Sequence, residues 1–315
     1  MIFNAAEFYK QLDESYAKHD NAATEAFLQE ALKDVEFSMV LSHECACCSN
    51  ETCGDEAEVP DAQTVAWLNE RSEGMICILN EMGGFYRGMH RWDECLDAFS
   101  RSKAEMEALN LTETDNYAIV LVNVAGAYRL LGRLDEALDC YGKAEEIFAK
   151  NGTADAYTLS SLYNNTGLVY QDKGDLDKAA AFYTKGLETT KKGADSEAEV
   201  ATAYANLAAL YVAAGDFAKA EENINESLAI FKDLEGGMNA HYAGALNTKA
   251  ILAFRAGKLE ESVESFKAAI EKTRVIFGEN GDYVTACRNC AAVLTKLGKD
   301  EEAKTYLALA DKAGK

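Results

Sequence analysis

The sequence predicts an all-α protein built from stacked pairs of helices. Three observations support this class: a recurring helix–turn–helix pattern, a scarcity of proline, and the absence of strand-like alternation. The 315 residues include one proline, Pro60, and the alternating runs of β-branched residues that are typical of strands are missing. Residues 122–150 indicate two helices joined at Gly132, and the same pattern recurs every 41 or 42 residues. Such a period is typical of a solenoid.

Each copy of the pattern is organised around one turn residue. Small side chains occur seven residues before the turn and five after it, where the two helices are expected to meet. A large side chain usually follows nine residues after the turn, where it is expected to fill the core. The turn residues are His90, Gly132, Gly174, Gly215, Gly257 and Gly298. The small residues are Gly83, Ala125, Gly167, Ala208, Ala250, Ala291, Cys95, Ala137, Ala179, Ala220, Ser262 and Ala303, and the core positions are Phe99, Tyr141, Tyr183, Ile224, Phe266 and Leu307.

These residues resemble the tetratricopeptide repeat (TPR), and the resemblance covers the chain from about Asp61 to the C-terminus. The basic TPR unit has about 34 residues. The longer units here are more similar to the variant found in kinesin light chains and in bacterial peptide-sensing regulators. The resemblance implies a right-handed superhelical solenoid of antiparallel helix pairs, with a concave inner surface that binds proteins or extended peptides.

The predicted organisation is an N-terminal helical cap followed by six repeats. Residues 3–18 and 21–41 indicate a helical hairpin in which Asp20 and Asn21 can cap the second helix. We interpret it as a plain capping hairpin; the alternative is a degenerate repeat that caps the stack, because terminal repeats are usually atypical. Turn formers and acids then mark a boundary near residue 60. The two predicted regions are 1–60 and 61–315, and the repeats span about 61–110, 111–152, 153–194, 195–236, 237–278 and 279–315.

Composition argues against several function classes. A formal net charge of −22 disfavours nucleic acid, because phosphate binding requires a basic surface, and it disfavours an anionic membrane surface likewise. The first ten residues lack the features of a signal peptide, and no run approaches the ~20 apolar residues of a transmembrane helix. Nine cysteines, an odd number, fit a reducing compartment. We therefore expect a cytoplasmic protein.

The first helix of each repeat carries asparagine on one face. The residues nine and ten positions before each turn lie on a stripe that the TPR resemblance places on the inner surface. One hypothesis is that these amides, each a donor and an acceptor, hold an extended peptide backbone. The alternative is that they brace neighbouring helices. The asparagines are Asn80, Asn123, Asn164, Asn165, Asn206, Asn247 and Asn289.

Arginines lie on or beside the same stripe, and they also leave two interpretations open. Guanidinium groups prefer carboxylate or phosphate partners, so a locally basic groove in an acidic protein would favour an acidic peptide. Ordinary surface ion pairing, which contributes little to stability, is the alternative. In repeat five, Lys249 replaces an apolar residue eight positions before the turn and makes the placement of Asn247 uncertain. The arginines are Arg87, Arg129, Arg255 and Arg288.

The segment that precedes Pro60 contains five potential metal ligands: His43, Cys45, Cys47, Cys48 and Cys53. Zinc is bound by four nitrogen or sulfur ligands, yet the usual pair of separated Cys-x-x-Cys motifs is missing. A metal-binding or thiol-sensing role and a set of unbound thiols both remain open. By contrast, Cys77, Cys95, Cys140, Cys287 and Cys290 occupy helical positions of the repeats, where they replace small apolar residues.

Motifs for catalysis are missing from the sequence. It contains no phosphate-binding glycine loop, His-Glu-x-x-His helix or Gly-x-Ser-x-Gly turn, so we expect no enzyme activity and no resident cofactor apart from the zinc alternative. The leading hypothesis is a non-catalytic adaptor that binds a protein partner or an extended peptide. The alternatives are a peptide-responsive regulator and a metal or thiol sensor. Self-association through the last repeat is a further expectation, because its apolar stripe near Leu307 has no following helix.

Overall fold

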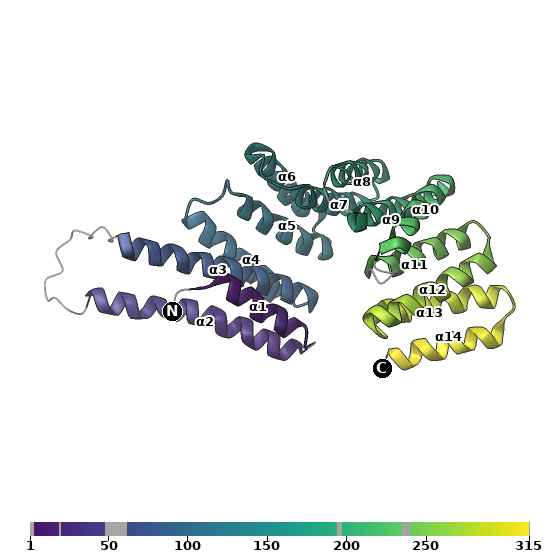
Figure 1. Cartoon of the computed structure of the whole chain (residues 1–315), viewed down its shortest axis with the longest axis horizontal. Coiled ribbons are helices and arrows are strands. Elements are labelled where there is room, and N and C mark those ends of the chain that lie inside the picture. Colours follow the sequence, from purple (N-terminus) through teal and green to yellow (C-terminus); the bar gives the residue numbers. More distant parts are fainter. Residues whose placement is uncertain (1–2, 19, 48–61, 194–196, 235–239, 315) are drawn as a thin grey trace. The chain divides into compact units, whose positions relative to one another are not determined.

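The computed structural model describes residues 3–18, 20–47, 62–193, 197–234 and 240–314, and for 37–47, 62–69 and 240 it describes the backbone alone. All regular elements in this part of the chain are α-helices (Figure 1). The all-α prediction is therefore confirmed. None of these helices combines the length and the apolar character that crossing a membrane requires.

The described helices follow the predicted pairs closely. The largest difference is at α2, which was expected to end at residue 41 and continues to Cys47. No glycine or proline interrupts this stretch, so nothing in the local sequence ends the helix there. In chain order the helices are α1 Ala5–Tyr16, α2 Asn21–Cys47, α3 Ala62–Gly88, α4 Trp92–Ala108, α5 Asp115–Leu130, α6 Leu134–Asn151, α7 Ala156–Asp172, α8 Leu176–Thr190, α9 Glu197–Ala214, α10 Phe217–Asp233, α11 Ala240–Arg255, α12 Leu259–Phe277, α13 Gly281–Lys296 and α14 Asp300–Ala313.

The predicted turn residues all adopt the left-handed backbone conformation. Their φ angles lie between 57° at His90 and 79° at Gly174 and Gly215. Glycine adopts this conformation without the steric penalty of a Cβ atom, which explains why five of the six turns use it. Each turn joins two helices that pack extensively against each other, so the predicted helix pairs are confirmed.

The N-terminal hairpin packs like a further repeat. Asp20 caps α2 as expected, because its Oδ1 accepts a hydrogen bond from the amide of Ala23 at 3.1 Å. The hydroxyls of Ser15 and Thr24 join α1 to α2 at 2.8 Å. α2 then contacts α3, just as the second helix of one repeat contacts the first helix of the next.

The contacts within a pair confirm the predicted roles of small and large residues. A Cβ atom added to Gly167 would lie 2.6 Å from the Tyr183 ring, and one added to Gly83 would lie 2.5 Å from the Phe99 ring. Both rings are buried. A larger side chain at either glycine would clash with the aromatic ring of the opposite helix, which explains why these positions are small.

The helices divide into two compact units, residues 1–153 and 154–315. The first unit contains α1–α6 and the second contains α7–α14. The domain boundary expected near residue 60 lies outside the described residues. At the end of the second unit Ala310 is buried, whereas Leu307 is 44% exposed, in contrast to the buried core residues at the same position of the other repeats.

Candidate functional site

In the first unit, the inner-stripe asparagines bond to each other. The Asn123 Nδ2 donates to the Asn80 Oδ1 at 3.0 Å, which joins α5 to α3. The Arg87 Nη1 donates to the backbone carbonyl of Asn123 at 3.3 Å. These groups brace neighbouring first helices, as the second interpretation of the asparagine row proposed.

The arginines of this unit lie near a buried tyrosine. A Cβ atom added to Gly126 would lie 2.9 Å from the Arg87 Nη1 and 3.9 Å from the Tyr141 hydroxyl. Burial raises the pKa of Tyr141 to about 12, although the positive charges of Arg129 and Arg87 oppose the shift. Arg87 therefore occupies the space above the glycine and is part of the packing between α3 and α5.

Helix α1 covers another part of the inner stripe of α3. Burial raises the pKa of the Tyr9 hydroxyl, and the neighbouring Cys77 and Glu81 side chains of α3 add to the shift. Burial raises the pKa of the Glu81 carboxyl, and the nearby charge of Asp13 adds to the shift. The N-terminal hairpin thus already lies against polar groups on the inner stripe of the first repeat.

The second unit arranges its asparagines differently. The Asn164 side chain points towards Gly186 on α8. A Cβ atom added to Gly186 would lie only 2.9 Å from the Asn164 Oδ1. That oxygen is buried without a hydrogen-bond partner among the described residues. Asn165 and Asn289 are half-buried on α7 and α13. Asn206 and Asn247 both line one cavity.

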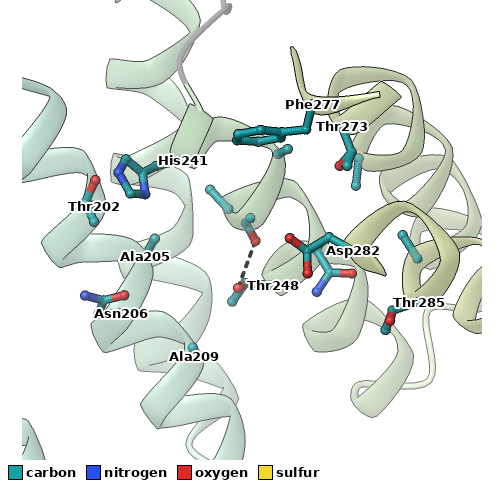
Figure 2. A pocket seen from close by; sticks show the side chains of 16 residues that line it. Thr202, Ala205, Asn206, Ala209, His241, Thr248, Thr273, Phe277, Asp282 and Thr285 are labelled. Atoms are coloured by element: carbon teal, nitrogen blue, oxygen red, sulfur yellow. Dashed lines mark hydrogen bonds between the residues drawn. The ribbon is translucent and has the colours of Figure 1, made fainter. Parts of the chain in front are cut away.

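We call this cavity the α9–α13 hollow. It has a volume of about 440 Å³ and is bounded by α9, α11, α12 and α13. Figure 2 shows Thr202 and Asn206 on one wall, with Thr248 on the neighbouring helix. The full lining is Thr202, Ala205, Asn206, Ala209, His241, Ala243, Gly244, Ala245, Asn247, Thr248, Ala269, Thr273, Phe277, Asp282, Thr285 and Ala286.

Half of this lining lies thirteen, ten, nine or six residues before a turn, and these positions share one face of the first helix with the asparagines. The asparagine positions contribute Asn206 and Asn247, so Asn247 lies on the stripe despite the substitution of Lys249 two residues later. The sequence pattern did not single out the four threonines of the lining, although three of them, Thr202, Thr248 and Thr285, occur at stripe positions. It also missed His241, Phe277 and Asp282, which lie near helix ends, where the repeat pattern carries no information.

The lining is polar but carries little charge. Its ionisable side chains are His241 and Asp282. Asp282 lies in the first turn of α13, where the helix dipole favours a negative charge. Arg288 is exposed nearly two turns further along α13, and Arg255 is exposed at the end of α11. The hollow can therefore offer amides and hydroxyls to a ligand, with the cations outside its lining.

The cysteines within the repeats behave as core residues. Cys95, Cys287 and Cys290 are buried, and burial raises the pKa of the Cys290 thiol to about 12. A thiol with a raised pKa is a weak nucleophile at neutral pH. Of the proposed metal ligands, Cys48 and Cys53 lie outside the described residues. His43, Cys45 and Cys47 lie on α2, where the backbone alone is described.

Comparisons with solved structures identify the same architecture. BtubC (BKLC) from P. vanneervenii is 22% identical with a TM-score of 0.60, and the match covers 70% of this chain and 90% of that one. NprR in complex with its cognate peptide NprX is 17% identical with a TM-score of 0.61, covering 100% and 79%. Aspartyl phosphate phosphatase F from Bacillus subtilis is 12% identical with a TM-score of 0.65, covering 98% and 68%.

The sequence itself matches one family model. No curated protein matches the chain. The model of the MalT-like TPR region matches residues 97–309, which is more than half of the chain and includes the whole of α5–α13. Together with the six left-handed turns and the close glycine–aromatic contacts, this match confirms the TPR assignment. The chain belongs to the MalT-like TPR region family.

Proposed function

We propose that the protein is a non-catalytic binding module that holds an extended peptide segment of a protein partner in the α9–α13 hollow. The observation that carries this proposal is that Asn206 and Asn247 both line one cavity of about 440 Å³. The two side chains come from the first helices of successive repeats. Their spacing is therefore set by the stacking of the repeats, which makes them a pre-formed pair of anchors.

The chemistry of the lining suits a peptide backbone. An asparagine amide donates and accepts hydrogen bonds, which complements one peptide unit. The alanines and Gly244 leave room for a main chain to approach, and the threonine hydroxyls add further polar groups. The similarity to NprR, whose structure was determined with a bound peptide, supports a peptide as the ligand class.

A peptide-responsive regulator is the second candidate, and the similarity to NprR favours it. If the protein is such a regulator, binding of a peptide in the hollow would change its affinity for a further protein partner. A preference for acidic peptides rests on Arg288, which continues the stripe beyond Thr285 on α13. Because the lining itself contains Asp282, we expect this preference to be modest and sensitive to salt.

The test uses peptides selected from a displayed random library on the full-length protein. Replacing Asn206 or Asn247 with alanine should weaken their binding roughly ten- to a hundredfold, because an unpaired buried group costs about 1–3 kcal/mol. Arg288→Glu should weaken acidic peptides most. Isothermal titration calorimetry gives the Kd of each variant.

The matched control is Asn223→Ala. Asn223 lies on α10, away from the lining, and its Nδ2 bonds to the Lys219 carbonyl of its own helix. This variant should bind like the parent. Equal Kd values for the parent and both hollow variants, with circular dichroism showing intact helices, would refute the proposed site.

A further inference from the structure

Four repeats place a tyrosine four residues before the turn, and each of these rings lies beside a cation. Arg91 lies 4.6 Å from the Tyr86 ring centroid, and Arg133 lies 4.3 Å from that of Tyr128. Lys178 lies 5.1 Å from Tyr170, and Lys219 lies 5.2 Å from Tyr211. Cation–π contacts of this kind are attractive within about 6 Å. The tyrosine is therefore a regular part of the repeat.

The surroundings of Tyr86 show how such a ring is held. Its hydroxyl donates to the Glu25 Oε1 at 3.2 Å and accepts a hydrogen bond from the Gln29 Nε2 at 3.3 Å. Arg91 follows the turn directly and pairs with Glu25 at 2.7 Å. Glu25 and Gln29 are the fifth and ninth residues of α2, the second helix of the preceding pair. The 5% exposed ring thus fills a space between two successive pairs.

Repeat five has Ala253 at this position. A cavity of about 270 Å³ lies there, and we call it the Ala253 socket. It is smaller than the cavities of about 300–1,000 Å³ that hold drug-sized ligands, and its size suits one side chain. Lys249, the other departure of this repeat, lies one helical turn before Ala253 and also lines the socket. The full lining is Phe217, Ala218, Glu221, Ile224, Asn225, Lys249, Leu252, Ala253, Ala256, Lys258 and Glu261.

The socket retains the groups that hold the ring in the first repeat. Glu221 and Asn225 are the fifth and ninth residues of α10, as Glu25 and Gln29 are of α2. Lys258 follows the turn directly and pairs with Glu221 at 3.2 Å, as Arg91 pairs with Glu25. The Glu221 side chain is 54% exposed, against 25% for Glu25. A carboxylate, an amide and a cation therefore surround a space from which only the ring is missing.

The apolar part of the socket fits an aromatic ring. Leu252 and Ile224 are buried, and Phe217 contributes a partly exposed ring at the start of α10. Lys249 forms no ion pair within the part of the chain that the structure describes. Its ammonium group is available to contact the face of an inserted ring. Lys258 pairs with Glu221, as Arg91 pairs with Glu25 while it contacts the Tyr86 ring.

We propose that the Ala253 socket binds a tyrosine side chain of a partner protein, which takes the place of the tyrosine that repeat five lacks. The phenol hydroxyl would bond to Glu221 and Asn225, while the ring packs on Ile224 and Leu252. This site is separate from the α9–α13 hollow, because the two linings share no residue. The second unit would therefore have two binding sites, the hollow for a peptide backbone and the socket for a tyrosine side chain.

The probe is N-acetyl-tyrosinamide, compared with N-acetyl-phenylalaninamide, and binding is followed by NMR of methyl-labelled full-length protein. The tyrosine probe should shift the methyl signals of Ala253, Ile224 and Leu252 and should bind on the order of tenfold more tightly than the phenylalanine probe. Asn225→Ala should reduce this difference. The substitution Ala253→Tyr should raise the Tm and abolish the shifts, because the protein then supplies its own ring.

The control position is Ala213 on α9, which is exposed and lines neither cavity. Ala213→Tyr should leave both the Tm and the binding of the probe unchanged. The proposal is wrong if the tyrosine probe causes no shift at the Ala253 methyl, or if both probes bind equally well. A lower Tm for Ala253→Tyr, in a protein that otherwise remains helical, would likewise show that the socket is not equivalent to the Tyr86 site.

Discussion

Replacing Tyr183 with alanine should lower the free energy of unfolding by about 3–5 kcal/mol, the usual cost of removing a buried aromatic side chain. Tyr183 is completely buried and belongs to a core cluster that joins α8 to α9. Its ring lies directly against Gly167, which has no side chain to fill the space that the ring would leave. Urea denaturation monitored by circular dichroism measures the change.

Two related variants separate the causes of this loss. Tyr183→Phe keeps the ring but removes the hydroxyl, which donates to the Gln171 Oε1 at 3.0 Å, and it should cost only about 0.5–1.5 kcal/mol. Tyr157→Ala removes a ring that is 64% exposed and should cost far less than Tyr183→Ala. Similar losses for Tyr157→Ala and Tyr183→Ala would contradict the assigned core.

Replacing Ala137 with leucine should destabilise the protein by about 1–3 kcal/mol through overpacking. Ala137 has no exposed surface and lies at the small position of the second helix α6. The inserted side chain has no space unless α5 and α6 move apart. The change is measured by the same urea titration.

The same substitution at Ala149 provides the control, because this residue lies on α6 but faces solvent. Ala149→Leu should change stability by no more than about 0.5 kcal/mol. If Ala137→Leu is as stable as the parent, the small residue is not required for close packing and the register of the repeats is wrong.

The fold could be predicted from the sequence because its determinants are local and repeated. A left-handed glycine such as Gly132 ends one helix, and small residues at fixed distances define where its partner packs. Because the same residue types recur at the same spacing in six copies, each copy supports the helix boundaries inferred from the others. The end of α2 was missed, since it lies outside the repeats and no turn former stops the helix before Cys47.

The candidate site was only partly predictable. The offset of the asparagines from the turn identified Asn206 and Asn247, but it could not distinguish them from Asn80 and Asn123, which occupy equivalent positions and bond to each other. Whether an amide faces a cavity or a neighbouring amide depends on the residues of the adjacent repeat. Opposite Asn123 stands another asparagine, whereas Ala205 and Gly244 leave the second unit open.

The Ala253 socket could not be predicted from the sequence, for a different reason. The missing tyrosine is visible in the sequence, yet a small residue at this position can equally indicate tighter packing. The last repeat has Leu294 there, and that side chain is completely buried. Only the three-dimensional structure shows that the space in repeat five stays open and that Glu221 and Asn225 border it.

Site-specific photo-crosslinking tests most directly whether the inner stripe of the second unit is the binding surface. A benzophenone side chain would be placed at Thr248, which lines the α9–α13 hollow, and separately at Glu222, an exposed residue of α10 outside that lining. Library-selected peptides should crosslink to the variant substituted at position 248 and not to the one substituted at 222. Crosslinking at position 222, with none at 248, would show that the peptide binds the second helices and would contradict the proposed function.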